Sequence, residues 1–208
     1  MDISAIAALA PVVPVLTIER TADAVPLARA LVKGGLRVLE ITLRTATALE
    51  ALKAIAAEVP EAVVGAGTVL EPAQFEFVKL IGGRFAVSPG CTPKLVTAAR
   101  AAGLPFLPGI QTVSEAMVLA EQGFRLLKFF PADAAGGLGW LKAAAAPLAG
   151  LRFCPTGGVG AATAQAYLSL ANVACVGGSW VAPGDAVAAG DWVRIERLAA
   201  AAAQLKRP

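Results

Sequence analysis

A lysine and a glutamate interrupt two segments that otherwise have the apolar pattern of buried strands. Lys128 lies in residues 126–131 (LLKFFP), and Glu40 lies in residues 38–42 (VLEIT). An amine that burial keeps partly neutral can attack a carbonyl carbon, and a neighbouring carboxylate can then move protons. The alternative is a structural ion pair with no chemistry of its own. The position of a lysine inside a strand favours the chemical role.

Arg44 and two glycine pairs are candidates for binding anions. Arg44 follows the segment that contains Glu40, where its guanidinium would either bind a carboxylate or lie in solvent. The pairs at residues 157–158 and 177–178 each follow a further apolar run. Glycines let backbone N–H groups approach an anion, and the N-terminus of the following helix favours negative charge. Glycine pairs also form ordinary turns, so their position in the fold must decide whether they bind an anion.

The amino-acid composition excludes several other kinds of catalytic site. The 208 residues include no histidine, which excludes Ser–His and Cys–His nucleophile pairs and metal sites that need imidazole. Charged residues make up 16%, below the roughly 25% typical of globular domains, which fits either surface hidden in an oligomer or an alanine-rich coding bias. The net charge of +3 is scattered along the chain, so no nucleic-acid partner is expected.

The cysteines and the uncharged stretches indicate a cytoplasmic protein. Cys91, Cys154 and Cys175 are odd in number and lack C-x-x-C spacing, as expected of reduced thiols. Residues 153–184 carry no charge, but their two prolines and six glycines predict buried strands and a helix rather than a membrane span. The N-terminal stretch is uncharged too, yet Asp2 argues against a signal peptide.

The elements that must position these residues recur at a steady interval. Eight short β-branched or aromatic runs alternate with segments of helical periodicity. The runs end at Thr17, Thr42, Gly67, Ser88, Gly109, Phe130, Thr156 and Gly177, at intervals of 25, 25, 21, 21, 21, 26 and 21 residues. Such alternation predicts parallel βαβ units, and eight of them in about 200 residues is the lower size limit of a (β/α)8 TIM barrel. The alternative is an open doubly wound sheet.

The sequence therefore predicts a single α/β domain over residues 1–208, with residues 3–9 as an extra N-terminal helix below the barrel. In a barrel, functional groups gather at the C-terminal ends of the strands, and alternate strands share layers of inward side chains. Lys128 and Glu40 lie in the sixth and second strands, both even, so we expect them to meet across the mouth.

Seven motifs occur in an order that is typical of one family. They are VVPV at 12–15, EITLR at 40–44, GAGT at 65–68, SPG at 88–90, PGI at 108–110, KFFP at 128–131 and PTGGV at 155–159. From about residue 11 to residue 183 the sequence resembles the 2-keto-3-deoxy-6-phosphogluconate (KDPG) aldolase and 4-hydroxy-2-oxoglutarate aldolase family. The resemblance implies a class I, metal-free aldolase, a carbon–carbon lyase of the Entner–Doudoroff pathway of carbohydrate metabolism. It would cleave a phosphorylated 2-keto-3-deoxy acid to pyruvate and glyceraldehyde 3-phosphate, as a homotrimer.

The resemblance also implies a role for each motif residue. Lys128 would form a covalent imine (Schiff base) with the substrate and Glu40 would be the acid/base, with no cofactor and no metal. Arg44 and Thr68 would hold the pyruvyl carboxylate. The remaining residues implied are Pro89 and Phe130 for the pocket, and Thr156, Gly157, Gly158, Gly178 and Ser179 for the phosphate.

Three alternatives stay open at this point. The enzyme could prefer 4-hydroxy-2-oxoglutarate or the galactonate-derived epimer of the substrate. A non-catalytic barrel that binds phosphorylated sugars would instead use Lys128 and Glu40 as a structural ion pair. Two further residues lie near the expected mouth: Cys91 is expected to be an inert thiol, and Asp133 a loop or helix-start residue.

Overall fold

The computed structural model describes residues 1–207, in which parallel strands alternate with helices. The strands are β1 (Val12–Leu16), β2 (Val38–Thr42), β3 (Val63–Gly67), β4 (Ala86–Val87), β5 (Phe106–Leu107), β6 (Gly109–Ile110), β7 (Leu126–Phe129), β8 (Arg152–Pro155) and β9 (Val176–Gly178). The helices are α1 (Ile3–Ala7), α2 (Thr21–Lys33), α3 (Ala48–Glu58), α4 (Ala73–Leu80), α5 (Pro93–Ala102), α6 (Val113–Glu121), α7 (Gly137–Ala144), α8 (Ala164–Leu168), α9 (Gly184–Ala189) and α10 (Trp192–Ala203). The predicted α/β class is confirmed.

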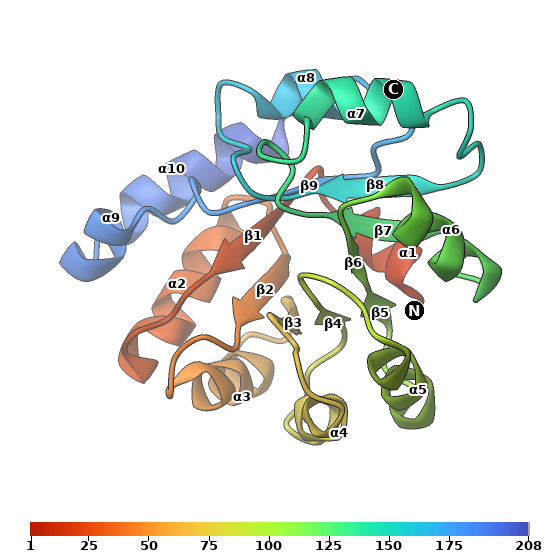
Figure 1. Cartoon of the computed structure of the whole chain (residues 1–208). Helices are drawn as coiled ribbons and strands as arrows, with labels where there is room; N and C mark the ends of the chain where they lie inside the picture. The colour runs from red at the N-terminus through yellow and green to blue at the C-terminus, as the bar shows by residue number, and fades with distance from the viewer. Residues whose placement is uncertain (208) are drawn as a thin grey trace.

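The strands form a curled six-stranded sheet, in the order β5-β4-β3-β2-β1-β9, and a three-stranded sheet, β6-β7-β8. Only Pro108 separates β5 from β6, and a proline has no N–H to donate to a sheet. At the other junction, isolated parallel bridges join Phe153 to Val173 and Thr156 to Gly177. Figure 1 shows most of the helices around the outside of the strands. The two sheets therefore follow one another around a common interior.

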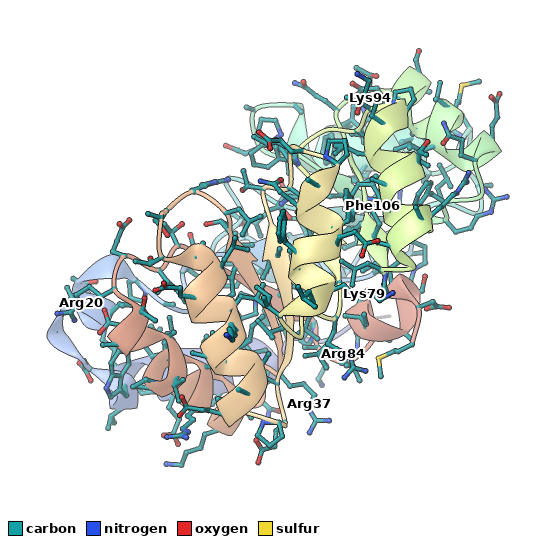
Figure 2. All side chains as sticks on the ribbon, turned by 90° about the horizontal axis from the view of Figure 1, so that it is seen from below. Arg20, Arg37, Lys79, Arg84, Lys94 and Phe106 are labelled. Carbon is teal, nitrogen blue, oxygen red and sulfur yellow. The ribbon has the colours of Figure 1, made fainter. Side chains whose placement is uncertain are left out.

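Side chains on the outer face of the strands pack against the helices. Phe106 of β5 meets Phe75 of α4 edge-to-face, with ring centroids 5.0 Å apart, and Figure 2 shows Phe106 between two helices. On the other side of the molecule, Phe129 of β7 stacks on Trp140 of α7 at 4.3 Å. Aromatic pairs of this kind add to the burial of apolar area, so they fix the helices on the strands.

The inner face of the strands encloses a second set of apolar side chains, called here the inner cluster. Its buried members are Ile6, Ala7, Val13, Val38, Phe85, Val87, Leu107, Leu126, Cys154, Ala174 and Cys175. The first two belong to α1, so this helix contributes to the interior at the N-terminal ends of the strands. The extra N-terminal helix predicted over residues 3–9 is thus present, and it ends at Ala7.

None of the helices among residues 1–207 is both long enough and apolar enough to cross a lipid bilayer. The uncharged stretch 153–184 contains β8 from its second residue onward, α8 and β9, in agreement with the expectation of buried strands and a helix. Short elements separated by glycine turns explain how so apolar a stretch is accommodated in the interior.

Candidate active site

Lys128 and Glu40 meet in the interior between the two sheets. Lys128 Nζ lies 3.1 Å from Glu40 Oε1, and the two residues are 3% and 2% exposed. They come from β7 and β2, which belong to different sheets. The cations that Figure 2 labels, such as Arg37 and Lys94, lie instead at the periphery. The expected contact is present. Of the ion pairs among the described residues, it is the one in which both side chains are buried.

The strand register explains why Glu40 reaches the interior. In β2, Glu40 is level with Val15 of β1 and with Gly65 of β3. A side chain at Gly67, two residues further along β3, would overlap the Glu40 carboxylate. The carboxylate therefore occupies space that the absence of a side chain at residue 67 leaves free.

Lys128 is positioned by both of its neighbouring strands. It is level with Gly109 of β6 and Cys154 of β8, and its backbone N–H donates to the Pro108 carbonyl at 2.9 Å. Its Nζ lies 5.3 Å from the centre of the Phe130 ring, within the range of a cation–π contact. The two neighbouring strands fix the height of Lys128, and an aromatic ring forms part of the surroundings of its amine.

The interior below this pair is filled. The inner cluster packs there, and the space left among its side chains and Glu40 amounts to about 10 Å³, about the size of one water molecule. No further ligand fits below the pair. A substrate must therefore approach Lys128 from the C-terminal ends of the strands, where the loops carry the other predicted site residues.

Arg44 and Thr68 form a second polar contact at these strand ends. Arg44 Nε donates to Thr68 Oγ1 at 3.0 Å, and the Leu43 N–H donates to the Gly67 carbonyl at 2.8 Å. Thr68 has a positive φ of 56°, which is uncommon for a residue with a side chain. Because the contact uses Nε, the terminal guanidinium nitrogens of the exposed Arg44 can bind a carboxylate.

The segment 156–158 packs on the loop that follows β7. Thr156 and Gly157 carbonyls accept hydrogen bonds from the N–H groups of Ala132 and Asp133, at 2.8 and 3.0 Å. Gly157 and Gly158 have φ values of 92° and 79°. A side chain at Gly158 would overlap Asp133, so this glycine is required by both conformation and space.

The end of β9 lies beside this segment. Thr156 is buried and bridges to Gly177, and a side chain at Gly177 would overlap the Thr156 hydroxyl. Gly178 ends the strand and Ser179 follows it, exposed. The helices that follow the two glycine pairs begin only at residues 164 and 184, so the loops offer their own backbone amides rather than a helix N-terminus.

The remaining candidates lie around this face. Pro89 is half-buried, and its carbonyl group packs so closely on Gly109 that a side chain there would overlap it. Burial raises the pKa of the half-buried Cys91 thiol to about 11, which agrees with an inert thiol. Asp133 is an exposed loop residue. Residues 1–207 hold no group of three Cys, Asp or Glu side chains that could bind a metal.

Two threonine hydroxyl groups at the same face were not predicted from the sequence as candidate site residues. Thr17 Oγ1 lies 3.0 Å from Thr42 Oγ1, and Thr42 Oγ1 donates to the Leu16 carbonyl at 3.1 Å. Both threonines stand at predicted strand ends, which was the one available signal. Among the described residues no hydrogen bond links these hydroxyls, or the Arg44–Thr68 contact, to the Lys128–Glu40 pair.

The chain is similar to known proteins of one family. A family model described as KDPG and KHG aldolase matches residues 3–198. The KHG/KDPG aldolase of Escherichia coli strain K12 is 53% identical over 189 residues, which cover 91% of this chain and 89% of that protein.

Two solved structures share the whole architecture. The KDPG aldolase of Zymomonas mobilis ZM4 with 3-phosphoglycerate is 47% identical, with a TM-score of 0.95, covering 99% of this chain and 97% of that one. The KDPG aldolase of Legionella pneumophila, with pyruvate captured as a covalent carbinolamine, is 45% identical, with a TM-score of 0.94, covering 97% and 98%. The resemblance inferred from the sequence is thereby confirmed, and the chain belongs to the KDPG and KHG aldolase family.

Proposed function

We propose that this protein is a class I aldolase that cleaves KDPG to pyruvate and glyceraldehyde 3-phosphate through an imine on Lys128. The observation that carries the proposal is the Lys128–Glu40 pair, buried at 3.1 Å with the inner cluster filling the space below it. The relative from Legionella, which holds pyruvate as a covalent carbinolamine, supports the same chemistry. The relatives named KDPG aldolase support the substrate.

The mechanism uses one amine and one carboxylate. Lys128 Nζ attacks the C2 ketone of the substrate, and loss of water from the carbinolamine gives the protonated imine, which can accept electrons. Glu40, directly or through water, takes the proton of the C4 hydroxyl as the C3–C4 bond breaks and the aldehyde forms. Glu40 then returns this proton, directly or through water, to C3 of the enamine, which restores the carboxylate. Hydrolysis of the imine then releases pyruvate and restores the amine.

The residues around the pair would bind the two ends of the substrate. Arg44 and Thr68, already joined at 3.0 Å, would hold the carboxylate, and Pro89 and Phe130 would line the pocket. The phosphate would lie on backbone N–H groups of the glycine loops, with hydroxyls from the same loops. The phosphate-binding residues proposed are Thr156, Gly157, Gly158, Gly178 and Ser179.

The finer architecture is also a proposal. A single domain with a closed eight-stranded TIM barrel is supported by Pro108 as the only residue between β5 and β6, and by the bridges from β8 toward β9. A homotrimer is supported by exposed apolar side chains on α4 and α6: Phe77, Leu80, Met117 and Val118. Sedimentation equilibrium should give three times the monomer mass of 21.0 kDa. A monomer would contradict the trimer without affecting the chemistry.

The decisive test is borohydride reduction in the presence of pyruvate. Reduction of the imine should add pyruvate covalently to Lys128, detected by peptide mass spectrometry. Lys128→Ala should give no adduct, whereas Lys142→Ala, at an exposed helical lysine, should label normally. Failure to label, under conditions that label a known class I aldolase, would contradict the proposal and favour the alternative of a non-catalytic barrel that binds phosphorylated sugars.

Substrate preference needs a separate measurement. The E. coli relative carries both KHG and KDPG in its name, so steady-state rates should be compared on KDPG, 4-hydroxy-2-oxoglutarate and the galactonate-derived epimer. The proposal expects the highest kcat/KM on KDPG. It also expects EDTA to leave the rate unchanged, because the protonated imine supplies the electron acceptor that a metal would otherwise provide. Strong inhibition by EDTA would contradict the metal-free, cofactor-free mechanism.

A further inference from the structure

The two threonine hydroxyls at the ends of β1 and β2 have no part in the mechanism above. Thr42 is fully buried, and its Oγ1 donates to the Leu16 carbonyl oxygen at 3.1 Å. Thr17 is exposed, and its Oγ1 lies 3.0 Å from Thr42 Oγ1. The hydroxyl pair thus has one member anchored in the core and one member open to a ligand at the strand ends.

The number of protons decides what the open member can bind. A threonine hydroxyl has one proton to donate and two lone pairs that accept. The proton of Thr42 is used on the Leu16 carbonyl, so the proton between the two hydroxyls must come from Thr17. Thr17 Oγ1 then presents lone pairs but no proton. It can accept a hydrogen bond from a ligand hydroxyl, whereas donating one to a phosphate or carboxylate oxygen would require breaking its bond to Thr42.

The position of Thr17 places this acceptor between the two ends of the site. The strand that it directly follows, β1, lies between β2, which carries Glu40, and β9, which ends at Gly178. Val13 belongs to the inner cluster, so by the alternation of a strand Val15 and Thr17 face the same interior. Val15 is level with Glu40, and Thr17 lies two residues further toward the open strand ends.

We propose that Thr17 accepts a hydrogen bond from the C5 hydroxyl of the substrate and so selects for it. The inference rests on the proposed function. KDPG has a carboxylate at C1, a ketone at C2, hydroxyls at C4 and C5, and a phosphate at C6. With C2 joined to Lys128 and the C4 hydroxyl facing Glu40, the C5 hydroxyl is the donor between the reacting carbons and the phosphate. That is the chemistry that Thr17 fits.

The test is aldol addition of pyruvate to two acceptors that differ in one hydroxyl. In glyceraldehyde 3-phosphate the C2 hydroxyl becomes the C5 hydroxyl of the product, and 3-phosphooxypropanal lacks only that group. The wild-type enzyme should prefer glyceraldehyde 3-phosphate by about tenfold in kcat/KM, the size expected for one hydrogen bond. Thr17→Val, which keeps the shape of the side chain, should lower the rate with glyceraldehyde 3-phosphate and remove most of this preference.

Thr17→Ser should restore the preference, because it restores the acceptor oxygen. Trapping of pyruvate on Lys128 should be equal in the wild-type protein and in both Thr17 variants. This result would separate binding of the C5 hydroxyl from imine formation. Equal losses with both acceptors in Thr17→Val would show a merely structural role, and no loss with either would show no contact. Either result would overturn the inference. If the wild-type protein itself traps no pyruvate, the proposed function fails first.

Discussion

The Lys128–Glu40 pair and the segment 156–158 lie at the same face of the molecule but are built in opposite ways. The pair consists of two long charged side chains that reach into the interior from strands β7 and β2. The segment has no charged side chain. It offers backbone groups, made accessible by two glycines with positive φ. One region depends on side chains being present, and the other depends on their absence.

This difference predicts how each region fails. Removing a functional group should abolish chemistry at the pair and leave an uncompensated charge behind. Adding a single methyl group should damage the glycine segment by strain and overlap, without changing any charge. Substitutions that separate chemistry, stability and phosphate binding therefore test whether the two regions have the roles proposed for them.

The largest effect is expected for Lys128→Met. Without the amine no imine forms, and kcat should fall by roughly 10⁴-fold or more, as for loss of other covalent nucleophiles. Steady-state assay on KDPG measures this loss, with Lys142→Met as the matched control at an exposed lysine. A Lys128→Met enzyme with more than a few per cent of wild-type activity would remove this residue from the mechanism.

Glu40→Gln should give the next largest effect. Loss of the proton acceptor should lower kcat by about 10²–10⁴-fold, while borohydride still traps pyruvate on Lys128. The variant should also lose about 3 kcal/mol of unfolding free energy, because a buried ammonium keeps no charged partner. Urea unfolding measures the second effect. The double variant Glu40→Gln/Lys128→Met should be less destabilised than Glu40→Gln. If the losses of unfolding free energy in the two single variants simply add in the double variant, the two residues are not coupled.

Gly158→Ala tests the glycine segment by adding one methyl group. A positive φ of 79° and overlap with Asp133 should strain the loop by about 1–3 kcal/mol and raise the KM for KDPG roughly tenfold. Pyruvate trapping should be unaffected. Gly160→Ala is the control, because nothing lies within 4 Å of its added side chain. Equal effects of the two substitutions would show that the segment is an ordinary loop.

The smallest effect is expected at Cys91, which belongs to neither region. Its raised pKa of about 11 leaves only about 0.1% thiolate at pH 8, so alkylation by iodoacetamide should be slow there and should speed up about tenfold per pH unit toward 11. Cys91→Ser should change kcat/KM less than twofold. Rapid labelling at pH 7 together with loss of activity would give this thiol a role that the structure does not predict.

The strand pattern could be predicted from the sequence because its signals are local. Each run of β-branched or aromatic residues ends within one residue of a strand end in the structure. The Lys128–Glu40 contact was predictable as well, since a charge inside an apolar strand is conspicuous and the sixth and second apolar runs of the sequence would share a layer in the expected barrel. Local pattern and barrel geometry were sufficient for these two features.

Features that depend on tertiary neighbours were not predictable. Gly67 matters because the Glu40 carboxylate lies where its side chain would be, which no spacing along the chain reveals. The pattern T-x-x-E occurs at two helix starts. Thr112 forms the capping box, but Thr47 donates instead to the Ile18 carbonyl at 2.7 Å. A neutral hydroxyl such as Thr17 leaves no trace in the pattern of charge or hydropathy.

The contact between Lys128 and Glu40 also has a consequence for folding. The two residues are 88 positions apart and come from different sheets, so their meeting closes a long loop of chain. Contacts of such long sequence separation form late, after the local βα units that carry them. During refolding, pyruvate-dependent borohydride labelling of Lys128 should appear after helical circular dichroism has returned. The reacting amine would then report, within a single polypeptide, the moment at which the two sheets join.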